Sequence, residues 1–402
     1  MKKIYTSIDI GSDNIKVVCA EINNNNLYIL SSVSLPSEGI KKGLIVDAAK
    51  TMISIKSAIS KTENILGVKV NKIIASIPSN NAIYSLVESS VSINEIVTGD
   101  DINNLLKKIK DTNKKEDYEI VNIFPINFML DDNIVSNPKN CSGQNLYCKA
   151  IMVSVPNLNV YSVCSILSNL NIEVVDITFN SIADYYSNCD IKNKEQIVGI
   201  INIGNEKTEV SVFNKGIIMN SSVINMGDNI IDIEISEKYN INLREVRSIK
   251  EKFINFNKRF AKINEKYSTL DINGDKIKLN QYELSNICMN KIIFLIKKAK
   301  NVLKDLTNKE ISSIIITGGC SDATGFSSLL NEISSNKIKL SNINYIGARE
   351  NKYSSCIGMI KYFDDKLLLR DTNYPLLQFD NNELSSNKDN KINKFFGYFL
   401  DK

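Results

Sequence analysis

The sequence predicts an α/β protein made of two similar lobes with a cleft between them, and a small α+β unit inserted in the first lobe. A strand–turn–strand pattern at residues 4–22 recurs at residues 196–213, and such a repeat is typical of internally duplicated proteins. Between residues 81 and 164, strand-like runs surround one helical stretch, which predicts the inserted unit. A chain of 402 residues with 43% hydrophobic content is long enough for these compact units.

The first lobe begins with a predicted β-hairpin. Alternating β-branched residues flank a turn at residues 9–12. Residues 51–66 have helical spacing, and residues 73–77 form a short apolar strand that Pro78 ends. We therefore assign residues 1–80 to the core of the first lobe.

The inserted unit is expected at residues 81–164. Its predicted strands cover residues 84–93, 118–130 and 150–155, and its predicted helix covers residues 100–110. The first lobe then continues over residues 165–196.

The second lobe is predicted at residues 197–345 and opens like the first. An apolar strand at residues 197–201 leads through a polar turn to an alternating strand at residues 208–213. Farther along, a long helical stretch precedes a buried strand that ends at Gly318 and Gly319, where glycine lets backbone approach a flat or anionic ligand. Residues 346–369 are assigned to a return into the first lobe.

The end of the chain combines a polar linker, residues 370–390, with a short amphipathic segment, residues 391–402. Five apolar residues of this segment fall on one helical stripe, and Lys394 lies among them. The five are Ile392, Phe395, Phe396, Phe399 and Leu400. We interpret the segment as a membrane-binding helix. The alternative is a C-terminal helix that docks on the protein's own core.

Composition excludes several classes of function. The chain has no histidine, which excludes Ser-His and Cys-His catalysis and removes the commonest zinc ligand. Its eight cysteines form no C-x-x-C pair and are expected to be free, buried thiols. A net charge of +4 is too small to predict nucleic-acid binding. With no secretory signal and no run of about 18 to 20 apolar residues, we expect a cytoplasmic protein.

The two predicted hairpin turns carry the candidate chemistry. Around the first, Asp9 and Lys16 flank a turn that contains Gly11, Ser12 and Asn14. Backbone amides, a hydroxyl, an acid and a lysine suit a β/γ-phosphate and a hydrated Mg²⁺. One such turn is common in ordinary hairpins. A more specific indication of a ligand site is the order of three features along the chain: this turn, the turn at Gly204 and the Gly318–Gly319 pair.

That order resembles the phosphate-1, phosphate-2 and adenosine motifs of the actin, Hsp70 and sugar-kinase superfamily. Within it, four stretches over the whole chain resemble the FtsA family of bacterial cell-division proteins: residues 7–12 with Asn14 and Lys16, residues 39–47, residues 137–138 with 142–143, and residues 316–319. The resemblance implies an actin-like (ribonuclease H-like) fold that binds ATP and Mg²⁺ between its lobes. The nucleotide-binding residues that it implies are Asp9, Gly11, Ser12, Asn14, Lys16, Asn202, Gly204, Thr208, Gly227, Lys250, Gly318 and Gly319, with Asp9 holding Mg²⁺ through water.

Several residues depart from the family pattern. Asn202 stands where the family has an aspartate, and Asn205 and Glu206 stand where it has glycines. Because side chains restrict positive φ, we expect the amides of the last two to be displaced. Arg247 replaces a nucleotide-contacting glutamate. We therefore expect weakened ATP binding and at most a weak ATPase.

By this resemblance the chain is an adaptor that self-assembles into filaments, works with other divisome proteins, and tethers FtsZ to an anionic membrane surface. Residues 227–300 would capture the C-terminal peptide of FtsZ. The expected location is the cytoplasmic side of the cell membrane at the division septum. One alternative is a PilM-like pilus-assembly adaptor, against which the tail counts. Another is an actin-fold kinase or ATPase, against which Asn202 counts.

Overall fold

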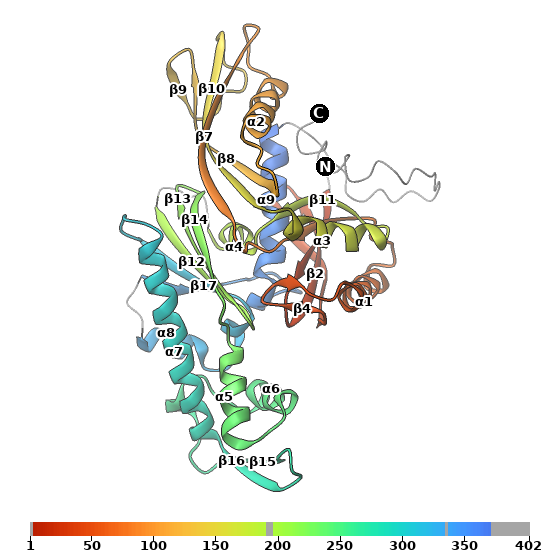
Figure 1. The fold of residues 1–402 in the computed structure, drawn as a ribbon, viewed down its shortest axis with the longest axis vertical. Helices are drawn as coiled ribbons and strands as arrows, with labels where there is room; N and C mark the ends of the chain where they lie inside the picture. The colour runs from red at the N-terminus through yellow and green to blue at the C-terminus, as the bar shows by residue number, and fades with distance from the viewer. Residues whose placement is uncertain (1–2, 190–195, 334–336, 371–402) are drawn as a thin grey trace.

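The computed structural model describes residues 3–189, 196–333 and 337–370. The amphipathic tail and its linker from residue 371 lie outside them. Two sheets form the middle of the molecule, while the inserted unit and a mostly helical subdomain lie at opposite ends of its long axis (Figure 1).

The first-lobe sheet has the order β11-β6-β1-β2-β3. Its strands are β1 (Lys3–Ile10), β2 (Asn14–Asn23), β3 (Asn26–Pro36), β6 (Lys72–Ser76) and β11 (Glu173–Thr178). The first three form an antiparallel meander, and β6 and β11 extend the sheet in parallel from β1. Buried Ile and Val side chains in β1 and β2 explain why these segments pair at the centre of the sheet.

The second-lobe sheet repeats this topology as β14-β13-β12-β17-β18. Its strands are β12 (Ile197–Ile203), β13 (Thr208–Asn214), β14 (Ile217–Ile224), β17 (Ser313–Thr317) and β18 (Ile338–Leu340). An antiparallel meander is again followed by two parallel neighbours. The predicted duplication is therefore confirmed, and the β1–β2 and β12–β13 turns occupy equivalent places.

Helices flank the first-lobe sheet. They are α1 (Ala48–Leu66), α3 (Asn157–Asn169), α4 (Asn180–Asn188) and α9 (Ser354–Arg370), and a small hairpin of β4 (Ile40–Lys41) and β5 (Leu44–Ile45) precedes α1. Asp47 caps α1 by accepting a hydrogen bond from the Lys50 amide. Helix α9 crosses α4 closely at Gly358, because a Cβ there would lie 1.7 Å from the carbonyl oxygen of Ala183.

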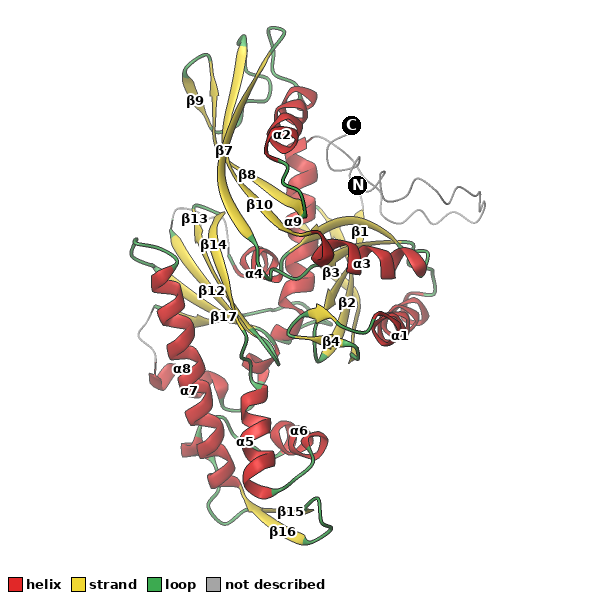
Figure 2. Cartoon of the chain, viewed as in Figure 1, coloured by secondary structure: helices red, strands yellow, loops and turns green. Residues whose placement is uncertain are grey.

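The inserted unit is a four-stranded sheet with one helix on its face (Figure 2). Its elements are β7 (Ile83–Ser92), α2 (Gly99–Asn113), β8 (Tyr118–Leu130), β9 (Asn133–Val135) and β10 (Asn145–Pro156). The apolar face of α2 and one face of the sheet share a separate core. On the other face, Phe124 stacks on Tyr362 of α9, which joins the unit to the first lobe.

The remaining elements belong to the second lobe and to its junction with the first. They are α5 (Asn229–Tyr239), α6 (Leu243–Lys252), η2 (Lys258–Phe260), β15 (Lys266–Leu270), β16 (Lys276–Asn280), α7 (Gln281–Asp305), η3 (Gly319–Asp322), α8 (Phe326–Ile333) and η4 (Asn351–Tyr353). Helices α5 to α7 share one apolar core with the second-lobe sheet, and the other face of that sheet contributes Val198, Ile200 and Phe213 to the core of the first lobe.

Candidate nucleotide cleft

The two equivalent turns meet where the lobes face each other. The Lys42 amide, in the β4–β5 turn, donates to Glu206 Oε2 at 2.6 Å. Beside it, Arg247 of α6 places a guanidinium nitrogen 3.4 Å from Asp13 Oδ1. Both contacts join one lobe to the other, so residues of the two lobes contact each other directly at the predicted cleft.

Asp9 and Lys16 form a buried ion pair at the base of the first turn. Lys16 Nζ lies 2.8 Å from Asp9 Oδ2, while Asn180 and Ser76 donate to Asp9 Oδ1 at 2.9 and 3.2 Å. Burial alone would raise the pKa of Asp9, but Lys16 and these hydrogen bonds outweigh it and lower the pKa below its usual value. Both oxygens of the predicted Mg²⁺ ligand are therefore already engaged.

The other predicted residues of the first turn are also tied into the chain. The Gly11 amide donates to the Asn14 carbonyl at 3.2 Å, and Asn14 Nδ2 donates to Asp13. Ser12 Oγ accepts the Gly43 amide at 2.9 Å. The Ser12 hydroxyl thus holds the β4–β5 turn against the hairpin.

In the second turn, the Gly204 amide donates to the Lys207 carbonyl at 3.0 Å. Thr208 is buried, and its hydroxyl donates to the Met226 carbonyl at 2.8 Å. Neither Asn205 nor Glu206 has a positive φ. This form of the turn therefore needs no glycine at those two positions.

Asn202 contacts a residue that the sequence analysis did not identify, Asp184 of α4. Asn202 Nδ2 donates to Asp184 Oδ2, which also accepts the Thr317 hydroxyl at 2.7 Å, and Ser355 donates to Asp184 Oδ1 at 2.9 Å. Asp184 is fully buried, and burial raises its pKa to about 6 against the hydrogen bonds that favour the carboxylate. An acid between Ala183 and Tyr185 on a buried helical face was the only signal in the sequence.

Lys250 of α6 is paired with two acids of α5. Its Nζ lies 2.8 Å from Asp232 Oδ1 and 3.3 Å from Asp228 Oδ2. Burial raises the pKa of both carboxyls, and Lys250 only partly offsets this. Next to Gly227, the Asp228 amide donates to the Gly204 carbonyl at 3.0 Å, so the start of α5 already contacts the second turn.

The predicted purine-side turn follows β17. Gly318 has φ +95°, and a Cβ there would lie 2.4 Å from the Ile203 carbonyl oxygen, so only glycine fits. At Gly319 the nearest atom to such a Cβ would be 3.7 Å away. Gly318 is therefore required by the close approach of β12, whereas the space beside Gly319 would admit a Cβ.

The charges around the two turns fit a triphosphate poorly. Six carboxylates and four cations take part in the interactions there, which leaves a formal charge of −2. They are Asp9, Asp13, Glu206, Glu209, Asp228 and Asp232, with Lys16, Lys207, Arg247 and Lys250. Every one of these four cations already has a carboxylate partner. Phosphates therefore fit only where these pairs open.

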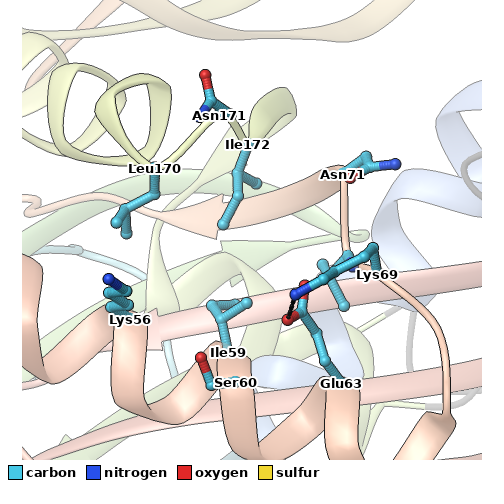
Figure 3. Close-up of a pocket in the computed structure, with 10 residues that line it drawn as sticks. Lys56, Ile59, Ser60, Glu63, Lys69, Asn71, Leu170, Asn171 and Ile172 are labelled. Carbon is cyan, nitrogen blue, oxygen red and sulfur yellow. Dashed lines mark hydrogen bonds and ion pairs between the residues drawn. The ribbon is translucent and has the colours of Figure 1, made fainter. Parts of the chain in front are cut away.

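A separate hollow of about 280 Å³ lies on the first lobe between α1 and the turn at residues 170–172 (Figure 3). Lys56, Glu63 and Lys69 line it, and Lys69 pairs with Glu63 at 2.8 Å. None of the predicted site residues lines this hollow. Within the described residues, no cluster of three metal-ligating side chains occurs, and no helix is long and apolar enough to cross a membrane.

Comparison with known proteins bears on both the insertion and the second lobe. The family model "SHS2 domain inserted in FTSA" matches residues 81–154, and the model "Cell division protein FtsA" matches residues 199–358. The chain is 24% identical over 366 residues to the cell division protein FtsA of Bacillus subtilis, covering 90% of this chain and 83% of that protein. It is also 24% identical over 388 residues to FtsA of Staphylococcus epidermidis, covering 94% and 82%. The chain belongs to the FtsA family.

Solved structures place the fold of this FtsA-family chain among actin-like proteins. A chain of the PilM–PilN type IV pilus biogenesis complex matches with a TM-score of 0.59 at 11% identity, covering 88% of this chain and 97% of that chain. MreB5 of Spiroplasma citri bound to ADP matches with a TM-score of 0.52 at 14% identity, covering 92% and 98%. The predicted actin-like fold is thereby confirmed.

Proposed function

We propose that this chain is an FtsA-type cell-division adaptor that assembles into actin-like filaments and tethers FtsZ polymers to the cytoplasmic face of the membrane at the septum. The observation that carries the proposal is the FtsA-type insertion, matched at residues 81–154 and folded as the β7–β10 unit within a duplicated actin-like body. Other divisome proteins are further expected partners.

The membrane contact is proposed for the tail. Its apolar stripe and Lys394 lie outside the described residues, so the proposal rests on the sequence pattern. The last described helix, α9, ends at Arg370.

FtsZ capture is proposed for the subdomain of α5 to α7. The three most exposed large apolar side chains there are Phe260 (65%), Ile263 (69%) and Ile272 (65%). Exposed apolar side chains are suitable anchors for a peptide, because burying them in a complex removes apolar surface from water. They are the first residues to test.

ATP with Mg²⁺ remains a proposal for the cleft. The Gly318–Gly319 turn would hold the purine, while the phosphates would reach the Lys16 and Lys250 ammonium groups only after their carboxylate partners part. We expect weak binding. We also expect slow or no hydrolysis, since Asn202 supplies an amide in place of a carboxylate.

Co-sedimentation with anionic liposomes tests the adaptor. We expect FtsZ from the same organism to pellet with liposomes only when the full chain is present. A chain truncated after Asn390 should still capture FtsZ in a pull-down but leave it in the supernatant. Ile263→Asp should lose capture, whereas Ile134→Asp, equally exposed (73%) on the insertion, should retain it.

Failure of the full chain to capture FtsZ in the pull-down would refute the adaptor and favour the PilM-like alternative. Brisk turnover of ATP, in the range of about 1–100 per second, would favour the enzyme alternative.

A further inference from the structure

Three side chains that depart from the FtsA pattern make contacts between the lobes. Asn202 of β12 donates to Asp184 of α4. Glu206, in the second turn, accepts the Lys42 amide at 2.6 Å. On α6, Arg247 contacts Asp13 of the first turn at 3.4 Å. Three of the residues that weaken the resemblance to a nucleotide site thus connect the two halves.

We propose that Asn202, Glu206 and Arg247 form a latch that holds the two lobes closed without nucleotide. In some two-lobed proteins only a bound ligand bridges the cleft. Their lobes then close to the extent that the ligand binds the closed state more tightly than the open state. Here the chain supplies the bridging contacts itself. The inference goes beyond the adaptor function and does not depend on it.

The Asn202 contact is the central one, because its acceptor Asp184 is fully buried. Asp184 accepts hydrogen bonds from β12 and β17 of the second lobe and from Ser355 at the start of α9. Hydrogen bonds to a carboxylate are stronger than neutral ones, and removing one donor from a buried acceptor is costly. One carboxylate therefore ties the second-lobe sheet to two first-lobe helices.

The Glu206 contact is supported by its neighbours. Lys207 packs directly against Gly43, where an added Cβ would lie 2.6 Å from Lys207 Nζ. The amide of the same glycine donates to Ser12. The β4–β5 turn is consequently held between the β1–β2 turn, through Ser12, and the β12–β13 turn, through Glu206.

The Arg247 contact is the most exposed of the three, because its side chain is 45% accessible and that of Asp13 is 39% accessible. Solvent-exposed ion pairs contribute little alone. Arg247 also lies 3.7 Å from the buried Asp232, which orients the guanidinium toward the cleft. Asp13 and Glu206, one acid from each turn, are both already engaged in contacts within the chain, so nucleotide is not required to complete the latch.

Small-angle X-ray scattering of the full chain tests closure directly. We expect the radius of gyration of the wild type to be the same without nucleotide and with millimolar Mg-ATP. The triple variant Asn202→Ala/Glu206→Ala/Arg247→Ala should be measurably larger without nucleotide. A wild type that contracts when Mg-ATP is added, or a triple variant as compact as the wild type, would overturn the proposal.

Hydrogen exchange measured by mass spectrometry gives a second, local readout. Without nucleotide, the Lys42 amide should exchange at least tenfold more slowly in the wild type than in Glu206→Ala. Glu206→Gln should preserve the protection, since its carbonyl oxygen accepts the same bond. Arg244→Ala serves as the matched control, because Arg244 is an exposed arginine on the same helix as Arg247. Unchanged exchange in the β7–β10 unit shows that the variants are folded. Equal exchange of the Lys42 amide in wild type and Glu206→Ala would contradict the latch.

Discussion

At the scale of single residues, the junction of the lobes depends on an amide facing a carboxylate. Asn202 and Asp184 are complementary because one donates and the other accepts. Thr317 and Ser355, the other donors to this carboxylate, are neutral hydroxyls. The negative charge of Asp184 is therefore stabilised by hydrogen bonds from neutral groups. A substitution that introduces a second acid at one of these groups would place it next to the buried carboxylate of Asp184.

Restoring the family's carboxylate by Asn202→Asp should therefore destabilise the protein. The new half-buried carboxyl would face the buried carboxyl of Asp184 without a donor between them, at a cost of about 3 kcal/mol in the free energy of unfolding. The exchanged pair Asn202→Asp/Asp184→Asn should recover at least about 1 kcal/mol of that loss. Denaturant unfolding of the wild type, both single variants and the pair measures the coupling, and simple additivity would contradict the contact.

The raised pKa of Asp184 predicts a pH dependence. Its folded pKa of about 6 exceeds the ordinary value of 3.8, so the folded state binds this proton more tightly. The resulting stability is fully present below pH 4 and is lost as pH rises through about 6. Relative to Asp184→Asn, which does not titrate, the wild type should lose about 2 to 3 kcal/mol between pH 4 and pH 7. Parallel stability curves for the two proteins would contradict this assignment.

At the scale of elements, helix α2 shows how local sequence sets a boundary. The Thr98 hydroxyl accepts the Asp101 amide, and the Asp101 carboxylate accepts the Thr98 amide, which completes a capping box. Behind this start, Ile102, Leu105 and Ile109 are buried against the insertion sheet. The capping box determines where the helix begins, and the apolar spacing determines which of its faces is buried. Both signals therefore predict the same helix.

Thr98→Ala should lower the stability of the inserted unit by about 1 kcal/mol, since it removes the cap. Thr112→Ala is the matched control on the same helix. Thr112 donates to the Lys108 carbonyl from an exposed position near the end, and alanine has the higher helix propensity. Hydrogen exchange of α2 amides distinguishes the two variants. Equal effects of both would show that the cap contributes no more than an ordinary surface residue.

At the scale of the whole molecule, the two lobes lie side by side and share a buried apolar cluster, while the insertion and the helical subdomain lie at opposite ends (Figure 1). One apolar core lies mainly in the first lobe but continues into the second-lobe sheet, where Val198, Ile200 and Phe213 belong to it. A second core lies within the second lobe. A third core lies between α9 and the first-lobe sheet. Helix α9 therefore connects three regions of the protein, because Ser355 near its start contacts Asp184 and Tyr362 contacts the insertion.

Membrane attachment should depend on self-association. Burying one large apolar side chain gains about 1.5 to 3 kcal/mol, and ordering each residue costs about 1 to 2 kcal/mol, so one tail should bind only marginally. Filaments would bind by avidity. We expect the bound fraction on anionic liposomes to rise steeply at the protein concentration where assembly begins, and Phe395→Asp/Phe399→Asp to abolish it. Equal binding by the doubly substituted chain would refute the tail as the anchor.

Prediction from the sequence succeeded where a pattern is local. The β1–β2 and β12–β13 hairpins follow from period-two alternation around polar turns, and the segment around α2 from helical spacing. The strands β3 and β14 were missed. Serines and exposed positions interrupt their apolar alternation, and each is held mainly by pairing to the strand before it.

The sequence by itself determined the duplicated α/β architecture, the inserted unit and the positions of the candidate turns, because each depends on residues within about ten positions of one another. Only the tertiary structure decided what those turns contact. Glu206 meets Lys42 across 164 positions, and Arg247 meets Asp13 across 234. Such pairs depend on how the two lobes are placed against each other. In the same way, the structural role of an amide in place of a carboxylate at position 202 is explained only by its contact with Asp184.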